Sequence, residues 1–358
     1  MSVPAADGRR ASSGLADRVN RAAIAAVLPG LAAAVGVAIA ARLIGLVLPA
    51  TISAVTVAVL LGLLVGQVPQ VRAADLGPGL SFAATRVLRF GIVLLGARLS
   101  LDQVVGIGVP AAVVVVVTMT GALLLVLGLS RLVSVEPALA VLLAVGAAVC
   151  GNSAVVATAP VIGARSRDVA YAVATVTLFG TAAVFVYPLI GHAIPMADAA
   201  FGLWSGIAIN DTSQVVAAGS AYSPGALEVA TVVKLIRNAL MAPLLLGIAW
   251  TWARSGHRAG DASAGLRKAV PLFVLGFLAM TILRTVGVIG KDPAAVLDAA
   301  SGWFIITGLA AVGLSIRVEE LRAIGPRALV VGFGAAVVVG LTTLGAILAF
   351  GTPIVAVR

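Results

Sequence analysis

Three short groups of polar and charged residues lie within stretches of sequence that are otherwise apolar. They span Cys150–Ala154, Asn210–Gln214 and Lys234–Asn238. Polar groups placed inside an apolar run need specific partners, because a hydrocarbon environment offers none. These groups are therefore the candidates for chemistry in this chain.

The first group favours an anion site. A Gly-Asn-Ser sequence in mid-span predicts that one helix ends and another begins at Asn152 or Ser153. The free N–H groups and the positive end of the new helix would then attract an anion. We expect Gly151, Asn152 and Ser153 to bind substrate, the alternative being that Asn and Ser merely bond to a neighbouring helix.

The second group contains a carboxylate, which costs roughly 2.5–3.5 kcal/mol at the centre of a membrane helix. We expect Asp211, with Asn210 beside it, to bind a coupling proton or sodium ion. The neutral side chains that follow would hydrogen-bond to substrate; they are Thr212, Ser213 and Gln214. The alternative is a structural ion pair for Asp211.

The third group carries two cations, Lys234 and Arg237, three residues apart on one helix face. One cation would pair with Asp211 on the preceding span, and the other would bind an anionic substrate. Alternatively both are structural, through snorkelling or through pairing with Asp211 and Glu228.

The sequence around these groups is that of an all-α integral membrane protein. Hydrophobic residues make up 61% of the chain and charged residues 11%. Val109–Leu129 is apolar on every face, which favours a helix over a barrel strand. We predict about ten or eleven transmembrane helices, at 22–48, 51–68, 87–98, 108–129, 138–162, 169–190, 199–219, 226–252, 269–289, 301–314 and 327–350.

Four of these spans are expected to be broken or short helices. Spans 138–162 and 199–219 carry polar residues in their middle, and 87–98 and 301–314 are shorter than a full crossing. Residues 1–20 are expected to be a disordered cytoplasmic segment. A single transmembrane domain follows at 21–350, with approximate halves 50–190 and 199–350, before a short tail at 351–358.

The net charge of +10 comes from basic residues that lie mostly between the spans. Their distribution favours a cytoplasmic N-terminus and no nucleic-acid partner. Arg98, near a span end, is expected to snorkel.

A local repeat relates Gly96–Val104 to Gly313–Leu321, and in both places an Ile-Gly pair follows. In an eleven-span arrangement the two copies leave the membrane in opposite directions, as in the inverted repeats of secondary transporters. Chance recurrence in a Gly-rich chain is the alternative.

The combination of motifs resembles the YeiH family of multi-pass bacterial membrane proteins, also named as sulfate exporters and similar to the bile acid:sodium symporter superfamily. The motifs that carry the resemblance are Cys150–Ala154, Ala159–Ile162, Asp211 with Gln214–Gly219, Lys234-Leu235 with Arg237, and Gly313–Ser315. Asn210 departs from the family pattern, in which this position is often histidine. The resemblance implies a substrate-moving core with discontinuous helices, packed against a panel of helices. It also implies a location in the bacterial inner membrane.

Together these observations predict a secondary transporter of a small anion, such as sulfate or a related sulfur oxyanion or sulfonate. It would work by alternating access coupled to a proton or sodium gradient. A channel or a membrane-embedded enzyme is the alternative, but no histidine lies beside Ser153 or Asp211 to activate a nucleophile. We expect no enzyme activity, no cofactor and no metal; a homo-oligomer is left open.

Overall fold

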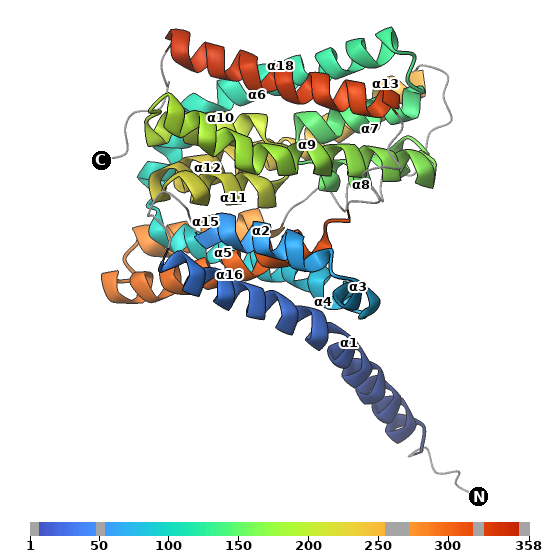
Figure 1. The fold of residues 1–358 in the computed structure, drawn as a ribbon, viewed down its shortest axis with the longest axis vertical. Helices are drawn as coiled ribbons and strands as arrows, with labels where there is room; N and C mark the ends of the chain where they lie inside the picture. Colours follow the sequence, from blue (N-terminus) through green and yellow to red (C-terminus); the bar gives the residue numbers. More distant parts are fainter. Residues whose placement is uncertain (1–6, 48–53, 255–271, 318–325, 351–358) are drawn as a thin grey trace, which may run out of the picture.

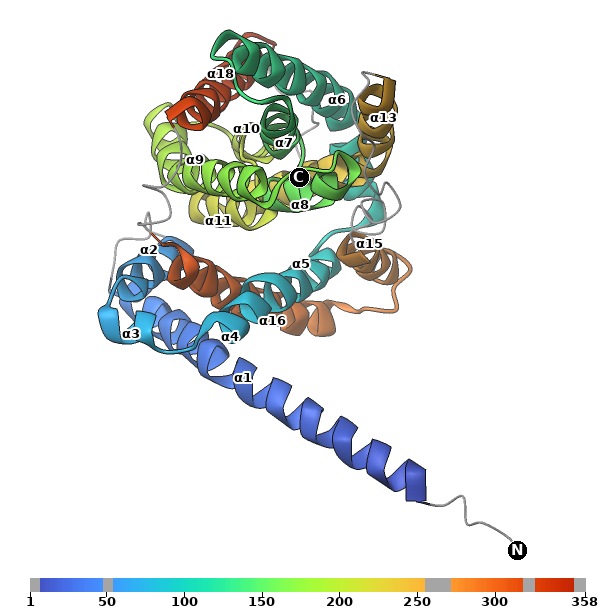
Figure 2. The ribbon, with the colours of Figure 1, turned by 90° about the vertical axis from the view of Figure 1, so that its right-hand side faces the viewer.

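The computed structural model describes residues 7–47, 54–254, 272–317 and 326–350, and every regular element among them is a helix. The helices form two layers, which lie one above the other in Figure 1 and Figure 2. The panel layer contains α1 (Asp7–Gly45), α2 (Ala54–Gly66), α3 (Pro69–Ala73), α4 (Gly77–Phe82), the π-helix η1 (Ala83–Val87), α5 (Leu88–Leu95), the 3₁₀-helix η2 (Gly96–Arg98), α15 (Leu272–Thr285) and α16 (Lys291–Ser315). The core layer contains α6 (Leu101–Leu132), α7 (Pro137–Ala148), α8 (Asn152–Val161), α9 (Ser166–Ala193), α10 (Asp198–Ala208), α11 (Thr212–Tyr222), α12 (Pro224–Ala239), α13 (Met241–Arg254) and α18 (Pro326–Phe350).

The helices have the length and surface of a membrane protein. Within the described residues, seven helices are long and apolar enough to cross a bilayer, and three shorter ones are also apolar. On α6 the side chains of Val109, Val113 and Val117 form an exposed stripe, which lipid rather than water can cover. The predicted all-α integral membrane fold is therefore confirmed.

Two expected breaks are present, and two others are not. The spans at 138–162 and 199–219 are divided into α7 and α8 and into α10 and α11. In contrast, the helical run Gly77–Arg98 has 22 residues and Lys291–Ser315 has 25, so the expectation of short spans at 87–98 and 301–314 was wrong.

In Gly77–Arg98 the error arises because Arg86 and Arg89 stand inside the helical run. In α16 it arises because charged residues near a helix start resemble a loop. Asp292 and Pro293 stand in the first turn of α16, where a carboxylate meets the positive helix end and proline loses no hydrogen bond. The predicted disordered segment 1–20 was also wrong from Asp7 onward, because α1 already begins there; its alanines favour a helix. The predicted tail at 351–358 lies outside the described residues.

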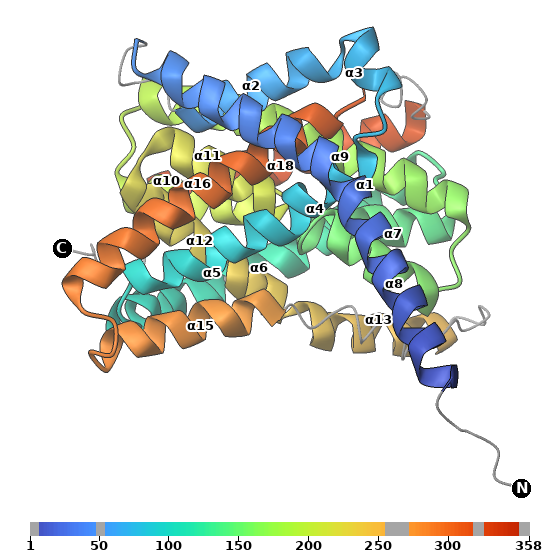
Figure 3. The same cartoon turned by 90° about the horizontal axis from the view of Figure 1, so that it is seen from below.

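In the panel layer, the two copies of the sequence repeat begin in similar surroundings. Figure 3 shows α5 and α16 side by side, with α15 along the outer side of α5 and α2 along that of α16. A Cβ atom at Gly96 would lie 2.4 Å from the Phe277 carbonyl on α15, and one at Gly313 would lie 2.4 Å from the Val59 carbonyl on α2. The two repeat glycines thus make equivalent close approaches, although Val318–Leu321 of the second copy lies outside the described residues.

The two layers touch through a few elements. Helix α11 of the core packs against α2 and α16 of the panel. Arg98 Nε at the end of the panel segment lies 2.5 Å from Glu228 Oε1 on α12, and its NH1 lies 3.7 Å from Asp298 Oδ1 on α16. Arg98 therefore pairs across the layers instead of snorkelling, and among the described ion pairs this is the one that joins them.

Candidate functional site

The two broken helices meet at their breaks. Gly151, between α7 and α8, has φ 63° and ψ −125°, a backbone conformation that side chains with a Cβ rarely adopt. A Cβ atom there would lie 3.2 Å from both N and Cα of Asp211, in the break between α10 and α11. The first two polar groups found in the sequence are therefore in backbone contact at the centre of the core layer.

The third group, Lys234–Asn238 on α12, lies along one side of this crossing. Lys234 is fully buried and Arg237 is 2% exposed. Lys234 Nζ donates to the carbonyls of Val149 (2.7 Å), Ile209 (3.1 Å) and Asn210. The Arg237 guanidinium donates to the carbonyls of Ala147, Ala148, Gly206, Ile207 and Ile209.

These carbonyls are the unpaired acceptors at the C-terminal ends of α7 and α10. Each end also carries the negative pole of its helix dipole, so one pair of cations on α12 neutralises both ends. Among the described ion pairs none joins Asp211 to Lys234 or Arg237, and Glu228 pairs with Arg98. Because carbonyls occupy their donors here, the two cations could bind substrate only by exchanging partners, and that role stays a prediction.

The N-terminal ends of α8 and α11 form the other side of the crossing, and they differ in how they are capped. Asp211 caps α11: its Oδ1 accepts from the N–H of Ser213 at 2.8 Å and from the Ser213 hydroxyl at 2.6 Å, while Gln214 completes the capping box. Helix α8 follows Gly151, which has no side chain to cap it. The first-turn N–H groups of α8 are therefore open to another acceptor.

Five polar residues at these two helix starts are only half-buried: Asn152, Ser153, Asp211, Thr212 and Ser213. The crossing thus brings the predicted residues of both breaks together with partly accessible side chains.

Helices α9 and α12 contribute contacts that the sequence did not reveal. Asn152 Nδ2 lies 3.1 Å from Thr177 Oγ1, and Gln214 Nε2 lies 3.3 Å from the Thr177 carbonyl and 3.4 Å from Thr181 Oγ1. Asn238 Nδ2 donates to Thr212 Oγ1 at 3.2 Å. Thr177 and Thr181 lie one turn apart on one face of α9, but this spacing alone does not distinguish them from other threonines in apolar helices.

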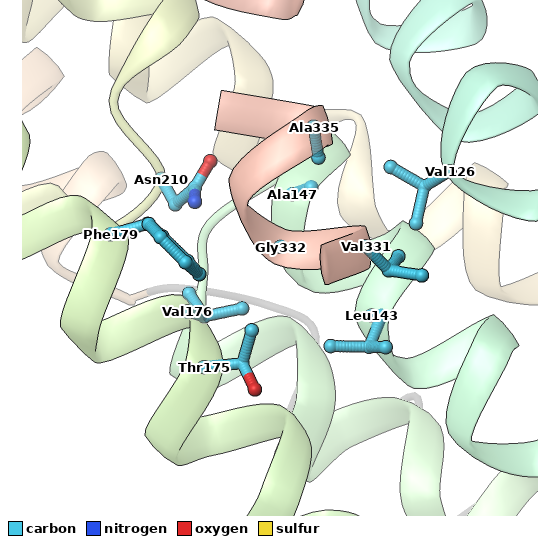
Figure 4. Close-up of a pocket in the computed structure, with 10 residues that line it drawn as sticks. All are labelled: Val126, Leu143, Ala147, Thr175, Val176, Phe179, Asn210, Val331, Gly332 and Ala335. Atoms are coloured by element: carbon cyan, nitrogen blue, oxygen red, sulfur yellow. The ribbon is translucent and has the colours of Figure 1, made fainter. Parts of the chain in front are cut away.

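Asn210 faces different surroundings from Asp211. Figure 4 shows its side chain in a narrow pocket, formed with residues of α6, α7, α9 and α18 and large enough for about one water molecule. The other lining residues are Val126, Leu143, Ala147, Thr175, Val176, Phe179, Val331, Gly332 and Ala335. In the described part of the chain, no cluster of three His, Cys, Asp or Glu residues could hold a metal ion.

Comparison with known proteins identifies the family. The family described as conserved hypothetical protein 698 matches residues 29–332. A UPF0324 membrane protein of Bordetella bronchiseptica is 35% identical over 72% of this chain and 81% of its own length. A UPF0324 membrane protein of Streptococcus pyogenes serotype M3 is 32% identical over 90% of this chain and 97% of its own length. No solved structure matches. The chain therefore belongs to the conserved hypothetical protein 698 family, the YeiH-like bacterial membrane proteins that its sequence motifs resemble.

Proposed function

We propose that this protein is a secondary transporter of a small anion, such as sulfate or a related sulfur oxyanion or sulfonate. It works by alternating access in the bacterial inner membrane, with its N-terminus in the cytoplasm, and a proton or sodium gradient drives it. The observation that carries the proposal is the crossing of two broken helices, with an uncapped helix start on one side and buried cations on the other. Discontinuous helices of this kind form the ion and substrate sites of many secondary transporters.

The charge at the crossing favours an anion. The two positive charges of Lys234 and Arg237 balance the carboxylate of Asp211 and the negative ends of α7 and α10, each of which carries roughly half a negative charge. The positive ends of α8 and α11 face the half-buried polar residues. An anion would accept from the first turn of α8, with Asn152 and Ser153 beside it, while Lys234 and Arg237 act as positioning residues behind it.

Asp211→Asn should uncouple transport from the driving gradient. An asparagine side chain can still accept from Ser213, so the cap on α11 is retained while the charge and the ionisable group are lost. In proteoliposomes loaded with radiolabelled sulfate, we expect concentrative flux to fall at least tenfold while sulfate–sulfate exchange persists.

Asp102→Asn, an exposed carboxylate in the first turn of α6, is the matched control and should behave as wild type. Gradient-driven flux that is unchanged in Asp211→Asn would remove this residue from the coupling role. A steady conductance too large for a turnover cycle would contradict a carrier and support a channel.

Alternating access requires the core layer to move against the panel layer, and the Arg98–Glu228 pair should report this movement. The Arg98 side chain is 33% exposed and that of Glu228 15%, so we expect a contribution of about 1 kcal/mol or less, equivalent to a change of up to about fivefold in the balance of states. Arg98→Gln should change the sulfate flux rate by up to that factor, and so should Glu228→Gln. The double variant should differ from either single variant by no more than about twofold, because both substitutions break the same ion pair.

The control pair is Arg165 with Glu136, which lies within the core layer at 3.2 Å. Arg165→Gln should leave flux unchanged because its partner moves with it. Effects of Arg98→Gln and Glu228→Gln that simply add in the double variant would mean that the pair does not link the two layers during transport.

A further inference from the structure

One face of α9 contacts both broken helices. Thr177, Gly180 and Thr181 share this face because residues three and four positions apart lie together on a helix. The Thr177 hydroxyl meets the Asn152 side chain of α8, and the Thr177 carbonyl accepts from Gln214 of α11. A single residue of α9 therefore bonds to the first turns of both half-helices.

The threonine hydroxyls on this face are used differently from most others. Thr158 and Thr175 donate back to the carbonyl four residues earlier in their own helices, at 2.7 Å in both cases, as threonine in an apolar helix usually does. Among the described residues, neither Thr177 nor Thr181 makes such a bond. Their hydroxyls are instead directed at the side chains of Asn152 and Gln214.

Gly180 makes this arrangement possible. A Cβ atom at this position would lie 1.9 Å from Gln214 Oε1, so the Gln214 side chain occupies the space that any other residue would fill. Gln214 is 4% exposed and also accepts from the Asp211 N–H at 3.2 Å. The α9 face thus fixes the capping box of α11 as well as the first side chain of α8.

We propose that Thr177 is a positioning residue of the anion site, which orients the Asn152 amide so that α8 and α11 present their polar groups to the same anion. The proposal rests on the proposed function, since it specifies what holds that site in shape. Asn152 contacts the anion and Thr177 acts through it. Without the Thr177 hydroxyl, the Asn152 amide rotates freely and binding weakens, while the movement of the two layers is unaffected.

The test is the concentration dependence of radiolabelled sulfate uptake into proteoliposomes by Thr177→Val and Thr177→Ser. We expect Thr177→Val, which keeps the side-chain volume but lacks the hydroxyl, to raise the half-saturating sulfate concentration about tenfold, the effect of one lost hydrogen bond. Its maximal rate should stay within about twofold of wild type. Thr177→Ser should restore the half-saturating concentration.

Thr118→Val is the matched control, because the Thr118 hydroxyl bonds within its own helix α6 to the Val114 carbonyl at 2.7 Å. If Thr177→Val does not reach the membrane, Thr177→Ala provides the same measurement.

Two results for Thr177→Val would overturn the inference alone: an unchanged half-saturating sulfate concentration, or a lower maximal rate that Thr177→Ser does not restore. Wild-type protein that neither transports sulfate nor is stabilised by it would overturn the proposed sulfate function and the inference together.

Discussion

Replacing Arg237 with methionine should prevent most of the protein from reaching a stable folded state. The guanidinium donates to five carbonyls at the ends of α7 and α10. Methionine fills a similar volume but donates nothing, and each buried acceptor left without a donor costs about 1–3 kcal/mol. The total would be several kcal/mol, a large part of the stability of a typical folded protein. We expect little monodisperse protein in detergent and a thermal midpoint lower by at least about 10 °C.

Two variants make this result interpretable. Arg237→Lys keeps the charge but loses the planar fork, so we expect a stability between those of wild type and Arg237→Met. Arg131→Met removes an exposed arginine from the last turn of α6 and should leave the midpoint unchanged. Arg237→Met with wild-type stability but no sulfate flux would show that the guanidinium serves the substrate rather than the helix ends, as the sequence alone suggested.

The role of these cations shows where inference from the sequence reaches its limit. Two positive charges in an apolar span, Lys234 and Arg237, indicated that negatively charged partners must exist, and both side chains are buried. The partners are main-chain carbonyls, however, and every residue has one, so no side-chain pattern identifies them. The breaks could be predicted because Asn152 and Asp211 interrupt apolar runs. Which ends of the broken helices face the cations depends on how the segments cross in space, and a sequence does not contain that information directly.

The α9 face was missed for a different reason. Threonine is common in apolar helices, where its hydroxyl normally bonds to its own backbone, so Thr177 and Thr181 do not stand out. The contacts of Thr177 with Asn152 and Gln214, and the position of Gly180 against Gln214, show that this part of α9 supports the site. The apolar pattern does not separate the core layer from the panel layer, because both consist of apolar helices. Only the family resemblance implied this division.

Gly151→Ala should abolish sulfate transport and lower stability. Two effects contribute, an unfavourable backbone conformation and a steric clash, and substitutions at other glycines can distinguish them. The backbone at Gly151 has φ 63°, and holding a residue with a Cβ in such a sparsely populated conformation costs about 1–3 kcal/mol. The added methyl group would also lie 3.2 Å from N and Cα of Asp211, which cannot move away without shifting the start of α11. We expect sulfate flux below about a tenth of wild type and a thermal midpoint lower by several degrees.

Gly163→Ala isolates the conformational effect, because Gly163 has φ 61° but no atom within 4 Å of an added Cβ. Gly247→Ala, inside α13 with equally open surroundings and no positive φ, should be neutral or slightly stabilising. If the contact between the breaks matters, stability should fall in the order Gly247→Ala, Gly163→Ala, Gly151→Ala, with flux lost only in the last. Equal stability and flux in Gly151→Ala and Gly163→Ala would mean that transport tolerates separation of the two breaks, and an anion site shared by α8 and α11 would no longer explain their crossing.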